Sequence, residues 1–307
     1  MDEQNIDRPA ATVEANAGPA AASGQLSAQE TRRKPRPAPG PLIATQDGAR
    51  LFHRDWGAGK PVLFLSGWAL SSEMWGYVMV DLVDHGLRCV AYDRRGHGRS
   101  SDPGRGYDYD TLADDLAAVL EQLDLREVTL VGHSMSGGEI ARYLSRHGGG
   151  RIARAVFLAP TTPMLLRAAD NPDGLDLSLV EQARAAMRAD YPGWLADNAP
   201  PFFVDGTPPA MRAWVQQMML QCSMKALLDC NRASVEADFR DDLRRITVPT
   251  LVLHGDRDVS APLALTGEKT AALVPGSRLV VYEGAPHGLF ITHRERLSRD
   301  LLAFARG

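Results

Sequence analysis

The chain has 307 residues, of which 44% are hydrophobic and 23% are charged, an ordinary composition for a soluble globular protein. Its formal net charge of −4 gives no reason to expect nucleic acid or an anionic membrane surface as a partner. Three cysteines make no disulfide framework in a chain of this size and favour a reducing compartment. We therefore expect a cytoplasmic protein that uses neither a metal nor a cofactor.

Residues 1–40 differ from the rest of the chain, because they are rich in Ala, Pro, Gln and Gly and carry no periodic apolar pattern. Such a segment cannot bury enough apolar surface to offset its chain entropy, so we predict a disordered tail. The basic cluster at Arg32, Arg33 and Lys34 is followed by prolines rather than by an apolar segment, which argues against a secretory signal. We interpret this cluster as part of a solvated tail.

Past Pro41 the sequence alternates between short apolar runs and segments of helical periodicity. The clearest helix follows Asp110, the expected N-cap, and places Leu112, Leu116 and Leu120 on one face. This alternation predicts an α/β fold with a mostly parallel sheet of eight strands, helices on both faces and an antiparallel hairpin at its start. The strands are expected at residues 42–45, 51–56, 62–66, 88–92, 128–132, 155–159, 250–254 and 278–282.

The alternation stops between residues 160 and 245, where the sequence is helical in character and poor in strands. We interpret residues 161–245 as a mostly helical cap or lid, inserted over the carboxyl ends of the strands where ligands bind in open α/β sheets. The remaining segments, 41–160 and 246–307, would then form the two parts of one core.

Residues 128–138 read Val-Thr-Leu-Val-Gly-His-Ser-Met-Ser-Gly-Gly and carry the strongest functional signal. A strand that turns sharply into a helix at this point would hold Ser134 under backbone strain and expose its hydroxyl as a nucleophile, in a nucleophile elbow. Such a turn needs small residues two before and two after the serine, and Gly132 and Ser136 satisfy this need. The alternative is a Gly/Ser-rich turn without chemistry.

A serine hydroxyl needs a base within hydrogen-bond reach, and the base needs an acid that orients it. Asp258 follows the predicted strand 250–254, and His287 lies in a Gly/Pro-bounded loop after the strand 278–282. The resulting order of Ser, Asp and His along the chain is the one expected for a catalytic triad in this type of fold. We predict that Ser134, Asp258 and His287 form the triad.

Other candidates near these loops are assigned to structural roles. Asp256 lies nearer the strand end and is expected to brace the loop. His133 is expected to be a packing residue, and His254 and His293 are weaker candidates. No group of side chains has a convincing metal-ligand spacing.

Hydrolysis through a tetrahedral intermediate also needs an oxyanion hole, made of two backbone N–H groups. We expect one from Met135, directly after the nucleophile, and one from Trp68 in the loop after strand 62–66. Gly67 would allow a close approach of this loop. Trp68 could equally be a core aromatic residue.

The predicted insertion is rich in methionine and aromatic side chains, which suit an adaptable apolar pocket. Packing between helices explains the same composition, and the sequence does not separate the two interpretations. The residues expected to line a substrate pocket are Trp68, Met164, Trp194, Phe203 and Met218.

Taken together, these segments resemble the α/β-hydrolase superfamily and, within it, the cofactor-free bacterial haloperoxidase and aryl-esterase branch. The resemblance covers about residues 42–307. Two departures from the family pattern stand out, Ser66 in place of a histidine and Ser136 in place of a second glycine. The resemblance lies in the segments Ser66-Gly67-Trp68, 92–100, 132–139, 254–258 and Pro286-His287-Gly288.

The resemblance implies hydrolysis of esters or lactones, with acyl transfer to hydrogen peroxide as a side reaction. We therefore expect a serine hydrolase that cleaves a small or medium apolar carboxylic ester or lactone through an acyl-enzyme. Perhydrolysis or cleavage of a C–C bond in a dicarbonyl compound by the same triad is the alternative. A binding or signalling protein of low turnover is a third hypothesis.

Overall fold

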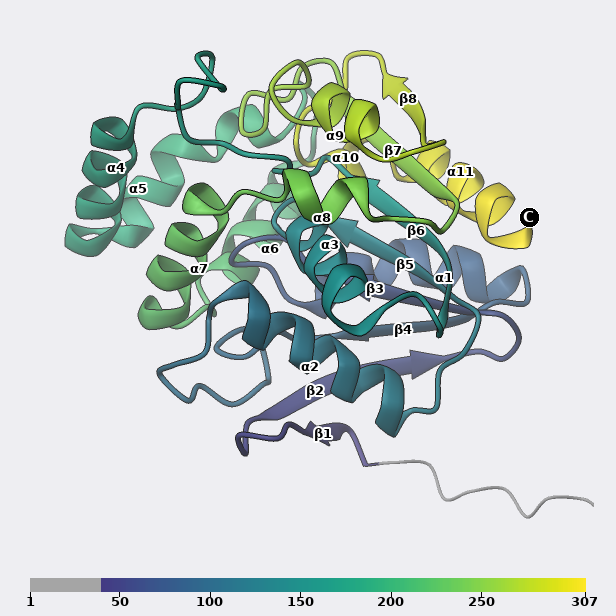
Figure 1. Cartoon of the computed structure of the whole chain (residues 1–307). Helices are drawn as coiled ribbons and strands as arrows, with labels where there is room; N and C mark the ends of the chain where they lie inside the picture. Colours follow the sequence, from purple (N-terminus) through teal and green to yellow (C-terminus); the bar gives the residue numbers. More distant parts are fainter. Residues whose placement is uncertain (1–39) are drawn as a thin grey trace, which may run out of the picture. The chain divides into compact units, whose positions relative to one another are not determined.

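A computed structural model describes residues 40–307 of the protein (Figure 1). Apart from Gly40, the predicted disordered tail lies outside these described residues. The strands are β1 (Leu42–Ala44), β2 (Arg50–Trp56), β3 (Pro61–Leu65), β4 (Arg88–Tyr92), β5 (Val128–His133), β6 (Ile152–Leu158), β7 (Thr250–Gly255) and β8 (Arg278–Tyr282). The helices are α1 (Gly76–Asp84), α2 (Tyr109–Gln122), α3 (Ser136–His147), α4 (Leu177–Ala189), α5 (Tyr191–Asn198), α6 (Pro209–Met219), α7 (Met224–Glu236), α8 (Arg240–Arg244), α9 (Gly267–Leu273), α10 (Leu289–Thr292) and α11 (Arg294–Arg306), with short 3₁₀ turns at Ser72–Trp75 and Pro200–Phe202.

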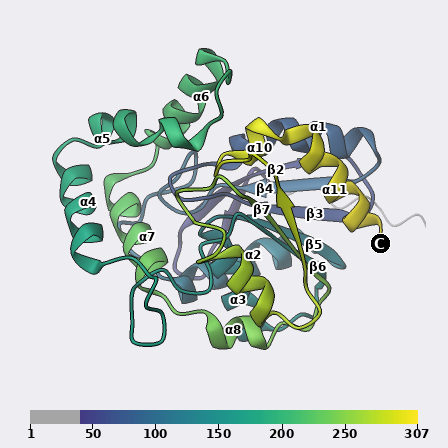
Figure 2. The ribbon, with the colours of Figure 1, turned by 90° about the horizontal axis from the view of Figure 1, so that it is seen from above.

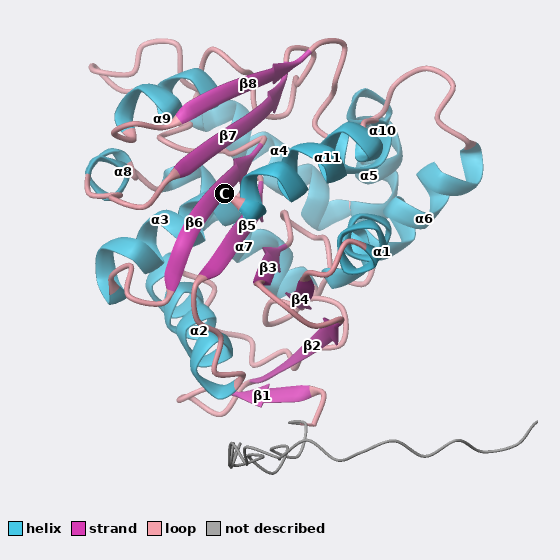
Figure 3. Ribbon diagram, turned by 90° about the vertical axis from the view of Figure 1, so that its right-hand side faces the viewer, coloured by secondary structure: helices cyan, strands magenta, loops and turns pink. Residues whose placement is uncertain are grey.

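The strands form one sheet in the order β1-β2-β4-β3-β5-β6-β7-β8 (Figure 3). β1 pairs with β2 and β2 with β4 in antiparallel fashion, and all later pairs are parallel. Every residue of β5 and β7 is buried, as expected for central strands that are covered on both faces. The predicted fold class, the starting hairpin and the number of strands are therefore confirmed.

Helices cover both faces of the sheet. α1 packs on α11 on one face, and α2, α3, α8 and α9 lie on the other (Figure 3). α2 begins at Tyr109, one residue before the expected N-cap. Its N-cap is Asp108, which is in extended conformation and accepts a hydrogen bond from the N–H of Thr111 at 2.9 Å. The prediction of Asp110 as the N-cap is thus wrong, because Asp110 already lies within the first turn of the helix.

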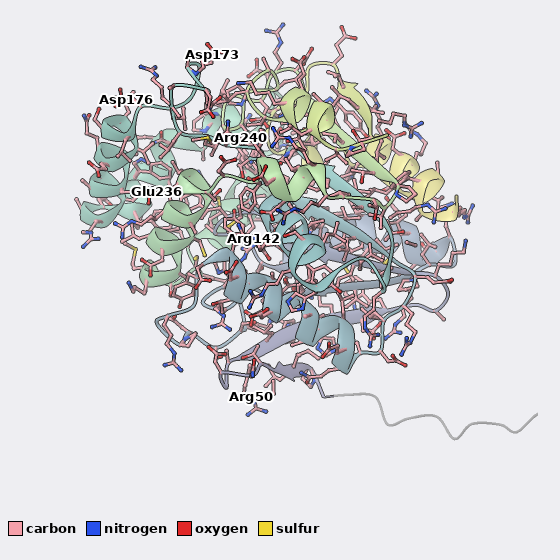
Figure 4. The ribbon with its side chains drawn as sticks, viewed as in Figure 1. Arg50, Arg142, Asp173, Asp176, Glu236 and Arg240 are labelled. Atoms are coloured by element: carbon pink, nitrogen blue, oxygen red, sulfur yellow. The ribbon has the colours of Figure 1, made fainter. Side chains whose placement is uncertain are left out.

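The helices α4 to α7 follow β6 and gather beyond one end of the sheet, to the left in Figures 1 and 2. They occupy the segment where the helical insertion is predicted. α8 then returns the chain to the sheet and is tied to α3, because Arg142 donates to the Asp242 carboxylate at 3.1 Å. Figure 4 labels Arg142 on α3 and Arg240 at the start of α8. Within residues 40–307, no helix has both the length and the hydropathy needed to cross a bilayer.

Candidate active site

The turn between β5 and α3 has the strained geometry that the sequence predicts. Ser134 has a backbone φ of +59°, in the left-handed region that non-glycine residues rarely adopt. A Cβ at Gly132 would lie 2.7 Å from the Cδ1 of Ile140 and 2.9 Å from the carbonyl oxygen of Ser136, so only glycine fits there. The strain is held by the surrounding structure, including the hydrogen bond from the N–H of Ser134 to the carbonyl of Leu158 at 2.9 Å.

Three loops at the carboxyl ends of strands bring Ser134, Asp258 and His287 into contact. The Nε2 of His287 lies 2.9 Å from the Oγ of Ser134, and its Nδ1 lies 2.6 Å from the Oδ2 of Asp258. All three side chains are buried. The structure therefore places the three residues of the predicted triad in one hydrogen-bonded row.

The carboxylate of Asp258 is held in its ionised form. Burial by itself would raise its pKa, but electrostatic attraction to the His287 ring and hydrogen bonds from His254 and His287 outweigh burial and keep the pKa of Asp258 well below its usual range. Its other oxygen accepts from the N–H groups of Ser260 and Ala261 at 2.9 and 2.8 Å. Since an ionised carboxylate only accepts, the Nδ1 of His287 carries a proton and its Nε2 is free to accept from the Ser134 hydroxyl.

Two further histidines support this row. The Nε2 of the fully buried His254 lies 2.8 Å from the Ala261 carbonyl and 3.2 Å from the Oδ2 of Asp258, so it braces the acid. Sequence reasoning missed this role, because it depends on how the loop after β7 folds back onto the strand end. Burial lowers the pKa of His133 to about 3, so its neutral ring donates from Nε2 to the backbone carbonyl of His287 at 3.1 Å.

The remaining aspartate of this region acts on the backbone. Asp256 accepts a hydrogen bond from the N–H of Gly284 at 2.7 Å and thereby joins the loop after β7 to the loop that carries His287. This is the bracing role expected for it. Among the described residues 40–307, no group of three or more His, Cys, Asp or Glu side chains is arranged to hold a metal ion.

Trp68 and Met135 are the residues expected to supply the backbone N–H groups of the oxyanion hole. Both residues line the same cavity as Ser134. Among the hydrogen bonds of residues 40–307, neither N–H is a donor, so both are available to an oxygen atom in the cavity. The loop that carries Trp68 packs closely against His133, the residue before Ser134, since a Cβ at Gly67 would lie 2.5 Å from the Nδ1 of His133.

The side chain of Trp68 connects the same loop to the helical segment. Its indole N–H donates to the carbonyl of Leu227 on α7 at 2.8 Å. Its ring also packs edge-on against Tyr191 and Trp194 of α5, with centroids 6.4 and 5.9 Å away. Trp68 is therefore both a neighbour of the nucleophile and a contact residue of the helices above it.

A cavity of about 460 Å³ opens onto Ser134 and His287. Most of its wall is apolar, and the segment from α4 to α7 contributes more of it than any other part of the chain, including polar side chains such as Asn231, Ser234 and Gln216. Such a size and lining are typical of sites for small organic molecules. The cavity can therefore hold an apolar substrate against the nucleophile.

Of the residues expected in this wall, Trp68, Trp194 and Phe203 line the cavity, and Met164 and Met218 do not. Met218 is turned into the core, because successive helical residues point about 100° apart and the cavity side of α6 carries Val215 and Met219. Met164 instead pairs through its backbone with Asp238. From the helical segment, Met187 and Met219 contribute methionine side chains to the wall, in addition to Met135 at the elbow.

Comparison with known proteins gives concordant matches. Residues 60–294 match the family described as alpha/beta hydrolase fold. The chain is 41% identical over 271 residues to a non-heme haloperoxidase of Rhodococcus erythropolis, covering 86% of this chain and 98% of that protein. It is 38% identical over 273 residues to a bifunctional esterase/perhydrolase of Acinetobacter calcoaceticus, covering 86% and 99% of the two chains.

Among solved structures, an esterase from Exiguobacterium antarcticum superimposes with a TM-score of 0.85 at 32% sequence identity. The match covers 87% of this chain and 100% of the esterase chain. The similarity thus extends over both the sheet and the helices that follow β6.

Proposed function

The chain belongs to the α/β-hydrolase superfamily, and from that premise we propose that it is a serine hydrolase of small or medium apolar carboxylic esters or lactones. The observation that carries the proposal is the row of Ser134, His287 and Asp258, joined at 2.9 and 2.6 Å at the floor of an apolar cavity. A relative that is 38% identical is named an esterase/perhydrolase, which supports chemistry at an acyl group.

In the acylation step, the Oγ of Ser134 attacks the ester carbonyl while the Nε2 of His287 accepts the serine proton. Asp258 holds the imidazole in the correct tautomer and stabilises the imidazolium that forms. The carbonyl oxygen becomes an oxyanion and takes hydrogen bonds from the N–H groups of Trp68 and Met135, each worth about 3 kcal/mol of barrier lowering. The imidazolium then protonates the leaving alkoxide, and the ester bond breaks.

Deacylation repeats these roles with water as the nucleophile. His287 accepts a proton from a water molecule as the water attacks the acyl-enzyme, and it returns the proton to Ser134 when the acid leaves. In this proposal, α4 to α7 act as a cap whose apolar wall binds the acyl or alcohol part of the substrate. The few polar side chains of the wall can donate hydrogen bonds to a substrate that carries an acceptor, such as a lactone.

The test compares Ser134→Ala with Ser145→Ala as a control. Ser145 lies on α3, and its hydroxyl donates to the carboxylate of Asp242 on α8. We expect Ser134→Ala to abolish turnover of p-nitrophenyl butyrate and labelling by a fluorophosphonate, while Ser145→Ala keeps both. Hydrolysis by purified Ser134→Ala at the wild-type rate would refute the assignment. A panel of aliphatic esters and lactones then defines the substrate class.

A second candidate activity is acyl transfer to hydrogen peroxide by the same triad. It is favoured by the names of two relatives, the haloperoxidase at 41% identity and the esterase/perhydrolase at 38% identity. Peroxide would replace water in the deacylation step and release a peracid. Measuring peracid and acid from the same ester, with and without added peroxide, gives the ratio of the two activities.

A further inference from the structure

A buried ion pair lies directly behind the loop that carries Trp68. Arg94, after β4, and Glu139, on α3, are 3% and 1% exposed, and the Nε of Arg94 donates to the Oε1 of Glu139 at 2.7 Å. Burial by itself would lower the pKa of Arg94, but the charge of Glu139 outweighs burial and keeps this pKa above its usual value. The guanidinium is therefore a fixed cation inside the protein.

This cation donates to two consecutive backbone carbonyls of the loop. Its Nη2 lies 2.6 Å from the carbonyl oxygen of Ser66, and its Nη1 lies 3.3 Å from that of Gly67. The Oγ of Ser136, fully buried, donates to the same Ser66 carbonyl at 2.6 Å and accepts from the Nη2 of Arg94 at 2.9 Å. Arg94 and Ser136 together form what we call the carbonyl clamp.

Within the clamp, Arg94 contacts the peptide group that matters for the oxyanion, whereas Ser136 holds the peptide directly before it. The carbonyl of Gly67 and the N–H of Trp68 belong to one planar trans peptide, so they point in opposite directions. With the oxygen anchored on Arg94, the N–H is directed to the other side of the loop, where the cavity lies. A cation on the oxygen also polarises the peptide and makes its N–H a stronger donor.

Two further hydrogen bonds anchor the loop at this point: the N–H of Leu70 donates to the Gly67 carbonyl at 3.2 Å, and the indole N–H of Trp68 donates to the Leu227 carbonyl at 2.8 Å. The hydroxyl of Ser66 is buried and makes no hydrogen bond within the described residues, so this side chain does not fix the loop. Ser136 stands where the family pattern has a glycine, and its hydroxyl duplicates the contact that Arg94 makes with the Ser66 carbonyl. Since this bond reaches the backbone of Ser66, it depends on the departure at position 136 and not on the side chain at position 66.

We propose that Arg94 and Ser136 are positioning residues that hold the Gly67–Trp68 peptide with its N–H toward the oxyanion formed at Ser134. The inference rests on the proposed hydrolase function. A residue that acts this way stabilises the transition state without binding the ground state, so its loss lowers kcat and leaves KM unchanged.

The primary test is Ser136→Ala, which removes one hydroxyl and keeps the ion pair. With p-nitrophenyl butyrate we expect about a ten-fold loss in kcat and a KM within two-fold of the wild type. The affinity for an aryl trifluoromethyl ketone, whose adduct on Ser134 carries an oxyanion, should fall by a similar factor. Ser136→Gly should behave in the same way.

Ser100→Ala is the matched control, because the hydroxyl of Ser100 also donates to a backbone carbonyl, that of Asp93, at 2.6 Å. It should leave kcat and ketone affinity unchanged. Arg94→Lys keeps the charge and loses the forked donor, so its kcat should fall further, by about a hundred-fold. If this variant does not fold, Ser136→Ala still decides the question.

The two proposals fail in different ways. A wild-type protein that neither hydrolyses esters nor binds the ketone contradicts the hydrolase function, and the inference falls with it. A wild-type esterase whose Ser136→Ala variant keeps both kcat and ketone affinity contradicts the clamp alone. A rise in KM with kcat unchanged also contradicts it, since that result indicates a role in ground-state binding.

Discussion

The loops around Ser134 and the helices α4 to α7 meet at one cavity but are built differently. In the loops, Asp258, His287 and Ser134 are fixed by directional hydrogen bonds in a buried setting. In the helices, the cavity wall consists mainly of methionine, aromatic and aliphatic side chains, whose contacts have no fixed direction. The comparison indicates that the reaction geometry is rigidly specified, whereas the fit to the substrate can adapt.

The largest expected effect concerns the acid of the triad. Asp258→Asn should lower kcat by about 10,000-fold, because the amide presents the wrong partner to the Nδ1 of His287 and disfavours the active tautomer. Asp256→Asn is the control, since an amide oxygen can still accept from the N–H of Gly284. Steady-state kinetics on both variants checks this prediction, and equal losses would argue against distinct roles for the two aspartates.

The second prediction compares how much an ion pair contributes to the free energy of unfolding in each of the two regions. Glu139→Leu leaves the Arg94 cation buried and unpaired, which should lower the free energy of unfolding by about 3–5 kcal/mol. On α7, Asp229→Ala breaks an exposed pair with Lys225, whose charged atoms lie 2.8 Å apart, and should lower it by about 0.5 kcal/mol or less. Urea unfolding measures both, and similar losses would show that the contrast is wrong.

A third effect tests the cavity wall. Met219→Ala enlarges the cavity and should shift relative kcat/KM toward longer acyl chains by about ten-fold. Its neighbour Met218→Ala removes the same atoms from the core, so it should destabilise the protein by about 2–5 kcal/mol and leave the chain-length preference unchanged. The measurement is a series of p-nitrophenyl esters from acetate to decanoate, and an identical shift in both variants would contradict the assignment of the wall.

The last prediction concerns the pH dependence of the free energy of unfolding. Residues 177–236 contain no histidine, so the histidines responsible for it lie outside the helices α4 to α7. Burial lowers the pKa of both His97 and His133 to about 3, so these rings are neutral when folded and protonated in the unfolded chain below about pH 6.5. The unfolded state then binds more protons, and the free energy of unfolding falls as the pH is lowered from about 6.5 toward 4.

His97→Gln should reduce this slope by up to about one proton, as measured by urea unfolding at several pH values. The carboxylates with lowered pKa values, such as Asp258, add their own loss only below about pH 4, and burial raises the pKa of Asp115 to about 6. The difference between the slopes with and without His97 therefore isolates the contribution of this histidine. A slope that is the same with and without His97 would contradict the prediction.

The sequence is most informative where short motifs lie at strand ends. Ser134, Asp258 and His287 could be selected because each follows an apolar run and is flanked by turn residues, and parallel strands bring such loops to one edge. The side of α6 that faces the cavity could not be predicted, because both Met218 and Met219 suit a core. The support from His254 depends on how the loop after β7 folds back, which no local pattern specifies.

The bond from the indole of Trp68 to Leu227 has a consequence for how substrate reaches the nucleophile. An outward movement of α7 would have to break this bond between the helix and the loop of Trp68. The bond therefore favours entry through a fixed mouth of the cavity over entry by displacement of α7. Leu175 and Val259 line the cavity and are 38% and 65% exposed, so they form an apolar rim where the cavity opens to solvent.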